Sequence, residues 1–159
     1  MLISIGCDNL GLQLKKPLVE EIEKLGHTVE DKGIYSEQDP YDYPDIAYAV
    51  AQSVAQKEAD RGILICGTGI GMALSANKVK GAYAAVCHDV YSTERSILSN
   101  NCNIMCMGAL VIGKATAVSL LKIWLDLTFQ PSHSSAKIAK FKKIEAGELE
   151  KPYGGDGVQ

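Results

Sequence analysis

Short apolar runs alternate with longer amphipathic stretches along almost the whole chain. Continuous apolar runs are typical of buried strands, whereas apolar residues spaced three or four apart, such as Leu14, Leu18 and Ile22, are typical of one helix face. The pattern predicts strands at residues 2–6, 27–31, 63–66, 82–87 and 104–107. It predicts helices at residues 11–25, 44–58, 69–78, 91–99, 115–128 and 135–146.

This alternation of strands and helices predicts an α/β fold. Strands that are apolar over nearly their whole length are buried on both faces, and the intervening helices provide the crossovers that parallel strands need. We expect one doubly wound, Rossmann-like three-layer domain with a five-stranded parallel sheet over residues 1–150, and a flexible tail at residues 151–159. Ligands of such sheets bind beyond the carboxyl ends of the strands, so the turns that follow the strands are the expected place for a site.

The turn after the third predicted strand is the most informative segment. Residues 66–71 read Cys-Gly-Thr-Gly-Ile-Gly, and a helical pattern resumes directly afterwards. Such a turn lets backbone N–H groups approach an anion at the positive end of a helix dipole, with the Cys66 thiol and the Thr68 hydroxyl beside them. Because Gly71 is followed by Met72, the turn has neither the ending of a nucleotide-binding P-loop nor the arginine of a cysteine phosphatase. The pattern predicts a base beside an oxyanion site; the alternative is that the glycines only allow tight helix–strand packing.

The composition of the chain limits which binding partners and which cellular compartment we expect for the protein. The chain has 159 residues, of which 47% are hydrophobic, so it is long enough to bury one core. Its net charge of −3 gives no electrostatic footprint for nucleic acid. The five cysteines include no Cys-x-x-Cys pair, and the first residues resemble neither a signal peptide nor a membrane segment. We therefore expect reduced thiols, a cytoplasmic location, no metal and no membrane association.

Several predicted turns bring polar side chains to the same edge of the sheet. Asp8 supplies a carboxylate, Cys66 a thiol, Thr68 a hydroxyl, and His88 with Asp89 a potential acid–base pair. A thiol base beside a carboxylate and backbone N–H groups suits proton transfer next to a carbonyl. The base removes the proton, the N–H groups hold the enediolate oxygen, and a second group moves protons between oxygens. His88 also has a plain structural interpretation, as a histidine bonded to Asp89 at a strand end.

These segments resemble the type B ribose-5-phosphate isomerase and galactose-6-phosphate isomerase family. The resemblance is carried, in the expected order, by Gly6-Cys7-Asp8, Asp42-Tyr43-Pro44, residues 65–71, Ala76-Asn77-Lys78-Val79 and Val111-Ile112-Gly113. It implies metal-free aldose–ketose isomerisation of a phosphorylated sugar through a cis-enediol, without a cofactor. It also implies a homodimer or a dimer of dimers in which each active site is built from two subunits.

The resemblance assigns roles to individual residues. Cys66 resembles the base that moves a proton between C1 and C2 of the sugar, and Asp8 would lie near the hydroxyls on those carbons. The enediolate would be held by the loop residues Gly67, Gly69, Ile70 and Gly71, with Thr68 as a partner. The remaining positions that match substrate contacts, some of them across the dimer interface, are Asn9, Tyr43, Ser99, Asn100, His133 and Lys137.

The departures from the family pattern lie in the parts that open the sugar ring and bind its phosphate. Asn9 and Ser99 stand where the family has histidines, the second of which opens the ring. Leu110 stands where an arginine is expected, and His133 and Lys137 fall at two further arginine positions. The proton-transfer residues are thus kept, while the ring-opening and phosphate-binding residues differ.

The departure at Ser99 leaves the substrate open between two sugars. A tetrose 4-phosphate cannot close a furanose ring and needs no ring-opening acid, and residues 87–101 resemble the branch of the family linked to erythrulose 4-phosphate. The competing interpretation is that His88 replaces the missing acid and ribose 5-phosphate is still used. A third is a sugar-phosphate-binding or partner subunit of a hetero-oligomeric isomerase, which retention of Cys66 disfavours.

Overall fold

The structure, a computed structural model, describes residues 1–149 and contains one parallel sheet. Its strands are β1 (Leu2–Cys7), β2 (Thr28–Asp31), β3 (Arg61–Cys66), β4 (Ala84–Val86) and β5 (Ile104–Gly108), in the order β2-β1-β3-β5-β4. The chain adds β2 on one side of β1 and then returns to place β3 on the other side. The carboxyl ends of β1 and β3 therefore lie together at a topological switch point, where open α/β sheets bind ligands. The predicted five-stranded parallel sheet is confirmed.

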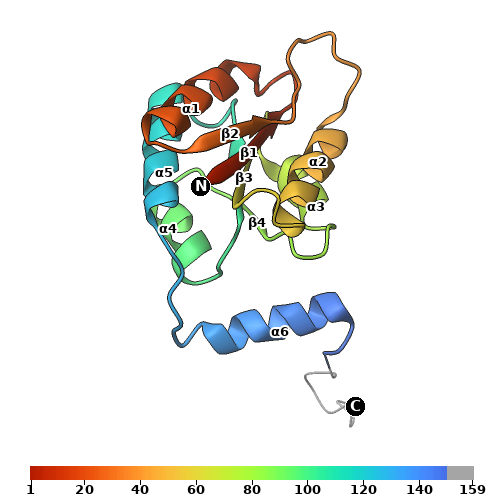
Figure 1. The fold of residues 1–159 in the computed structure, drawn as a ribbon, viewed down its shortest axis with the longest axis vertical. Coiled ribbons are helices and arrows are strands. Elements are labelled where there is room, and N and C mark those ends of the chain that lie inside the picture. Colours follow the sequence, from red (N-terminus) through yellow and green to blue (C-terminus); the bar gives the residue numbers. More distant parts are fainter. Residues whose placement is uncertain (150–159) are drawn as a thin grey trace, which may run out of the picture. The chain divides into compact units, whose positions relative to one another are not determined.

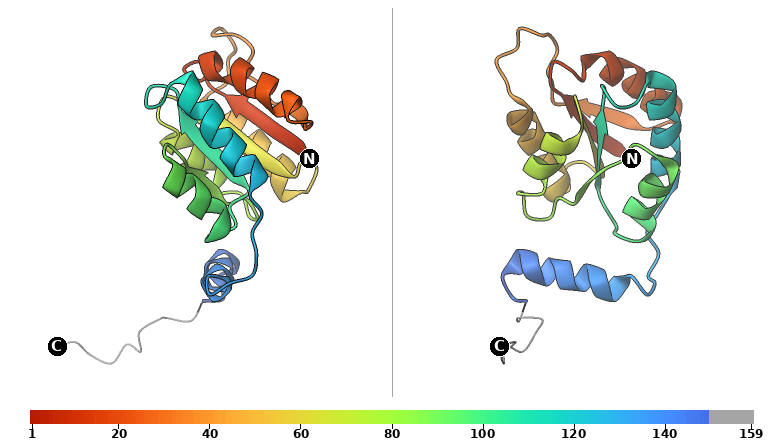
Figure 2. Two further views of the ribbon diagram at one scale, coloured as in Figure 1. Left: turned by 90° about the vertical axis from the view of Figure 1, so that its left-hand side faces the viewer. Right: turned by 180° about the vertical axis from the view of Figure 1, so that it is seen from behind.

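Helices cover both faces of this sheet, which gives three layers. Helices α1 (Leu12–Lys24), α4 (Val90–Leu98) and α5 (Lys114–Asp126) cover one face, and α2 (Tyr43–Ala55) and α3 (Ile70–Ala76) cover the other (Figures 1 and 2). The apolar face of each helix packs on strands that are buried along nearly their whole length. The indole N–H of Trp124 on α5 donates to the Ser96 hydroxyl oxygen on α4 at 3.1 Å, so this buried ring has a polar partner.

Several element ends differ from the predicted ones for local reasons. The helix predicted at residues 44–58 ends at Ala55, since Lys57 adopts a left-handed conformation with φ 62° and turns the chain toward β3. The helix predicted at residues 69–78 ends at Ala76, and the Asn77 side-chain amide bonds both the N–H and the carbonyl of Ala84 at 2.8 and 2.9 Å. That side chain links the end of α3 to the first residue of β4. The strand predicted at residues 82–87 is shorter in the structure, where β4 contains only Ala84–Val86.

The chain divides into two compact units. The first contains residues 1–129 and holds the whole sheet; the second begins at Gln130 and contains α6 (Ser135–Ala146), which ends at Gly147 with a left-handed φ of 71°. The single domain expected over residues 1–150 stays a prediction, and the tail expected at residues 151–159 lies outside the described residues. No helix within residues 1–149 is long and apolar enough to cross a membrane.

Candidate active site

The turn after β3 forms the centre of the candidate site. Cys66 ends the strand with a side chain that is 5% exposed, and its Sγ accepts a hydrogen bond from the Gly69 N–H at 3.1 Å. The exposed Thr68 hydroxyl oxygen accepts the Ile70 N–H at 3.3 Å. Gly69 adopts φ 77°, and a Cβ there would lie 3.1 Å from the Met107 backbone, so only glycine suits this position. The turn thus places a thiol within a set of backbone donors.

The carboxylate of Asp8 lies at the end of the adjacent strand β1. The Asp8 N–H donates to the Ile65 carbonyl at 3.1 Å, which ties the two strand ends together. Its side-chain Oδ1 accepts the N–H groups of Leu10 and Gly11 at 3.0 and 3.1 Å. Burial raises the pKa of Asp8 above its ordinary value, although these two hydrogen bonds favour the charged form. A Cβ on Gly11 would lie 2.6 Å from the Ile65 carbonyl oxygen, so the close approach of these segments requires glycine.

The end of β5 packs on the other side of the Cys66 turn. The N–H groups of Ala109 and Leu110 donate to the carbonyls of Cys66 and Gly67 at 2.8 and 3.0 Å. The Gly108 N–H donates to Nε2 of His88 at 2.8 Å. The alternative interpretation of His88 pairs it with Asp89, but its described hydrogen bond is the one from Gly108. The Asp89 carboxylate accepts the Ser92 N–H and caps α4. Burial lowers the pKa of His88, with the Asp89 charge opposing that shift.

Tyr43 reaches the same turn from helix α2. A capping box between Asp42 and Asp45 fixes the start of α2, so Tyr43 is its first residue. Its ring lies directly against Gly71, where a Cβ would be 2.7 Å from the ring carbon Cε2. The structure therefore brings together Asp8, the whole loop of residues 66–71, Tyr43 and, through Gly108, His88.

Other predicted site residues lie elsewhere within one chain. Ser99 and Asn100 follow α4, which connects the carboxyl end of β4 to the amino end of β5. There the Asn103 carbonyl accepts the N–H of Gly62, about 13 Å along β3 from Cys66. Ser99 and Asn100 are therefore near the opposite end of the sheet from the Cys66 turn. Asn9 is exposed in the turn after Asp8.

His133 and Lys137 belong to the second unit. Both side chains are exposed, His133 just before α6 and Lys137 on it. Their contact with substrate phosphate stays a prediction.

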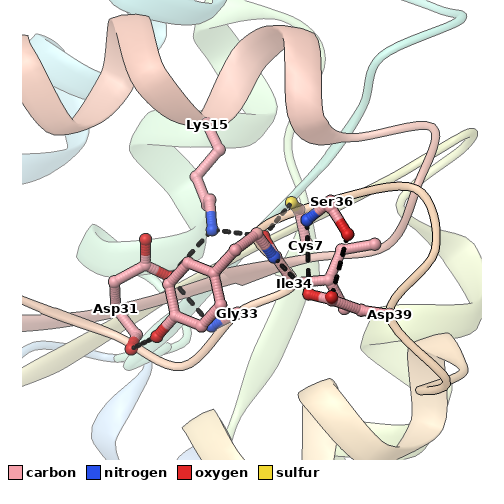
Figure 3. Close-up of polar contacts among 8 residues, drawn as sticks. Cys7, Lys15, Asp31, Gly33, Ile34, Ser36 and Asp39 are labelled. Carbon is pink, nitrogen blue, oxygen red and sulfur yellow. Dashed lines mark hydrogen bonds and ion pairs between the residues drawn. The ribbon is translucent and has the colours of Figure 1, made fainter.

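Sequence reasoning missed a buried ionic cluster that supports the end of β1. Lys15 on α1 is 7% exposed, and its Nζ donates to Asp31 Oδ1 at 2.9 Å and to the Ile34 carbonyl at 2.5 Å (Figure 3). The N–H of Cys7, the residue before Asp8, donates to the Gly33 carbonyl, and the Ile34 N–H donates to the Cys7 carbonyl. One signal was available: Lys15 falls on the helix face that Leu14, Leu18 and Ile22 define. A charged residue on an apolar face indicates a buried partner.

The assembled groups suit proton transfer next to a carbonyl. Across residues 1–149, no three His, Cys, Asp or Glu side chains cluster in a way that could hold a metal ion. The site combines a thiol with a backbone donor, a half-buried carboxylate, and an imidazole bonded to the backbone. A thiol near a carboxylate and several backbone donors can move a proton next to a carbonyl.

Comparisons with known proteins find relatives over nearly the whole chain. The model of the Ribose/Galactose Isomerase family matches residues 3–141. The chain is 48% identical over 148 residues to D-erythrulose-4-phosphate isomerase 2 of Mycolicibacterium smegmatis, covering 92% of this chain and 96% of that protein. It is also 48% identical over 145 residues to the Ribose-5-P isomerase B of Listeria innocua, covering 91% and 97%.

A solved structure has the same fold. Ribose-5-Phosphate Isomerase B of Clostridium thermocellum matches with a TM-score of 0.89 at 38% identity, over 94% of this chain and 100% of that one. Sequence and fold agree over nearly the full length, so the chain belongs to the ribose/galactose isomerase family.

Proposed function

We propose that this sugar-phosphate isomerase interconverts an aldose and a ketose by a metal-free cis-enediol route, with Cys66 as the base and a tetrose 4-phosphate as the substrate. The observation that carries the proposal is the thiol of Cys66 seated on the Gly69 N–H, beside Asp8 at the switch point of the sheet. The Gly69 N–H points at the sulfur atom, and the thiolate is the form of a cysteine that accepts a proton.

The reaction needs one proton to leave carbon and return to its neighbour. In the proposed mechanism the Cys66 thiolate takes the proton from the carbon next to the carbonyl and returns it to the former carbonyl carbon. The loop of residues 67–71 holds the enediolate oxygen. Asp8, with Thr68 as its partner, moves the hydroxyl proton to the former carbonyl oxygen, so that one O–H bond breaks and one forms. Cys66 is a thiolate again at the end of the cycle, so the reaction consumes no external acid, base or redox partner.

The proposal of a four-carbon sugar as the substrate depends on Ser99. Serine cannot act as the acid that opens a furanose ring, and a tetrose 4-phosphate has no such ring to open. Relatives named for erythrulose 4-phosphate are 48% and 40% identical to this chain. The second candidate is ribose 5-phosphate, since a relative named for that activity is also 48% identical.

The position of Ser99 and Asn100 supports a shared active site. These residues lie near the opposite end of the sheet from Cys66 in their own chain, so they would reach a substrate only from another subunit. Exposed apolar side chains around the site, such as Ile70 and Leu74 on α3, suit such a contact. We accordingly propose a homodimer or a dimer of dimers, located in the cytoplasm.

One relative favours a different assembly. The chain is 36% identical to a Galactose-6-phosphate isomerase subunit LacB of Clostridium acetobutylicum, so a partner subunit of a hetero-oligomer is the alternative. Under that alternative the purified chain binds a sugar phosphate but does not turn it over.

The test is proton NMR in heavy water, with purified protein offered erythrulose 4-phosphate and ribose 5-phosphate in parallel. We expect isomerisation of the tetrose with deuterium entering at C1 or C2, because the proton held by Cys66 exchanges with solvent. Efficient turnover of the pentose would overturn the tetrose assignment. Absence of turnover with both sugars, together with retained binding, would favour the partner-subunit alternative.

Gly71→Ala is expected to raise KM about three- to tenfold with little loss of stability. The added methyl group displaces the Tyr43 ring from the loop, and tenfold corresponds to about 1.4 kcal/mol of lost binding. Folding should not suffer, because alanine is favoured over glycine within a helix. Steady-state kinetics checks this in the parent and in a Tyr43→Ala background, where Gly71→Ala should add no further loss. An equal loss in both backgrounds would show that the effect does not pass through Tyr43.

A further inference from the structure

His88 makes its only described hydrogen bond through the ring nitrogen Nε2. That nitrogen accepts the Gly108 N–H at 2.8 Å. An acceptor nitrogen carries no proton, so the proton of a neutral ring is on Nδ1. Burial favours this neutral form by lowering the pKa of His88.

Gly108 is the point at which His88 meets the candidate site. A Cβ on Gly108 would lie 2.7 Å from Cα and the carbonyl carbon of Thr68, so the two backbones are in direct contact. The next two residues of the chain donate their N–H groups to the carbonyls of Cys66 and Gly67. The position of the Gly108 peptide therefore determines the position of the Cys66 turn.

An acid–base role would disturb this arrangement. A histidine that shuttles protons through Nε2 must carry a proton there in one state, and that proton would face the Gly108 N–H. The hydrogen bond would then be lost once in every turnover, and the end of β5 would be released from the turn. Nε2 is thus already occupied by its hydrogen bond with the Gly108 N–H.

We infer that His88 is a positioning residue, which holds the end of β5 against the Cys66 turn through Gly108, and does not transfer protons in the reaction. This inference rests on the proposed isomerase function for its kinetic test. Its structural test is independent of turnover.

The kinetic test compares His88→Ala with His88→Gln. Glutamine can present an amide oxygen to the Gly108 N–H but cannot exchange a proton near neutral pH. We expect His88→Ala to lower kcat about tenfold, the cost of one lost hydrogen bond at the turn, with a smaller change in KM. His88→Gln should restore kcat to within about threefold of the parent and leave the shape of the pH profile unchanged. If His88→Gln is as impaired as His88→Ala and loses one limb of the pH profile, His88 transfers protons and the inference is overturned.

The structural test uses the parent enzyme labelled with ¹⁵N-histidine. Long-range proton–nitrogen NMR assigns the tautomer of each ring, with His88→Gln identifying the signals of His88. We expect the Nδ1–H tautomer at neutral pH, with Nε2 unprotonated. The Nε2–H tautomer would overturn the inference even if the protein proved to have no isomerase activity.

Discussion

Replacing Cys66 with alanine is expected to lower kcat by a factor of about 10² to 10⁴, which is the contribution of a positioned general base. The fold should survive, because the Cys66 side chain makes one described hydrogen bond, to the Gly69 N–H, and alanine leaves the strand and its ladder unchanged. The affinity for substrate should change far less than kcat, since the loop glycines and Asp8 remain. Stopped assays of isomerisation, together with binding measured by calorimetry, separate these two effects.

The matched control is Cys102→Ala. Cys102 is half-buried before β5, near the amino ends of the strands, and its N–H bonds the Ser96 carbonyl rather than anything in the candidate site. Burial raises the pKa of its thiol to about 12, so it cannot serve as a base near neutral pH. Turnover by Cys102→Ala should equal that of the parent. An active Cys66→Ala protein would remove Cys66 from the mechanism, whatever the control shows.

The sequence predicts the fold well because its two strongest signals are local. Apolar strands separated by amphipathic helices specify a parallel sheet, and the Cys-Gly-Thr-Gly-Ile-Gly turn follows β3 where a doubly wound sheet binds ligands. The close approaches at Gly69 and Gly71 are visible in the sequence as glycines. Their partners, the Met107 backbone and the Tyr43 ring, are distant in the chain and become known only from the structure.

The hydrophobic pattern does not predict contacts between residues that are distant in the sequence. The periodicity places Lys15 on a helix at residues 11–25, yet nothing local pairs it with Asp31 at the end of β2. The contact of His88 is similar: Asp89 is its neighbour in sequence, whereas its partner in the structure is Gly108, on the strand that lies beside β4. The order of the strands in the sheet determines which distant residues form ion pairs and hydrogen bonds. The spacing of apolar residues along the chain does not specify that order.

Lys15→Met is expected to lower the free energy of unfolding by about 3 kcal/mol. Methionine keeps the apolar stem of the side chain, but it leaves the Ile34 carbonyl and the Asp31 carboxylate without the buried ammonium group (Figure 3). Breaking a buried ion pair by removing one partner costs about 3–5 kcal/mol, and the lower end applies because the Asp31 side chain is 31% exposed. Thermal and urea unfolding monitored by circular dichroism measures the loss, with a fall in Tm of about 6–12 °C.

The neighbouring lysine supplies the control for this prediction. Lys16 has a side chain that is 86% exposed and lies 4.0 Å from Glu20, so Lys16→Met removes the same charge from the same helix without breaking a buried contact. Its effect should be small, and equal losses in the two variants would mean that net charge, not the pair with Asp31, determines the stability. A double-mutant cycle with Asp31→Asn completes the argument. Because the two partners act through one contact, Lys15→Met should destabilise the Asp31→Asn protein by less than it destabilises the parent.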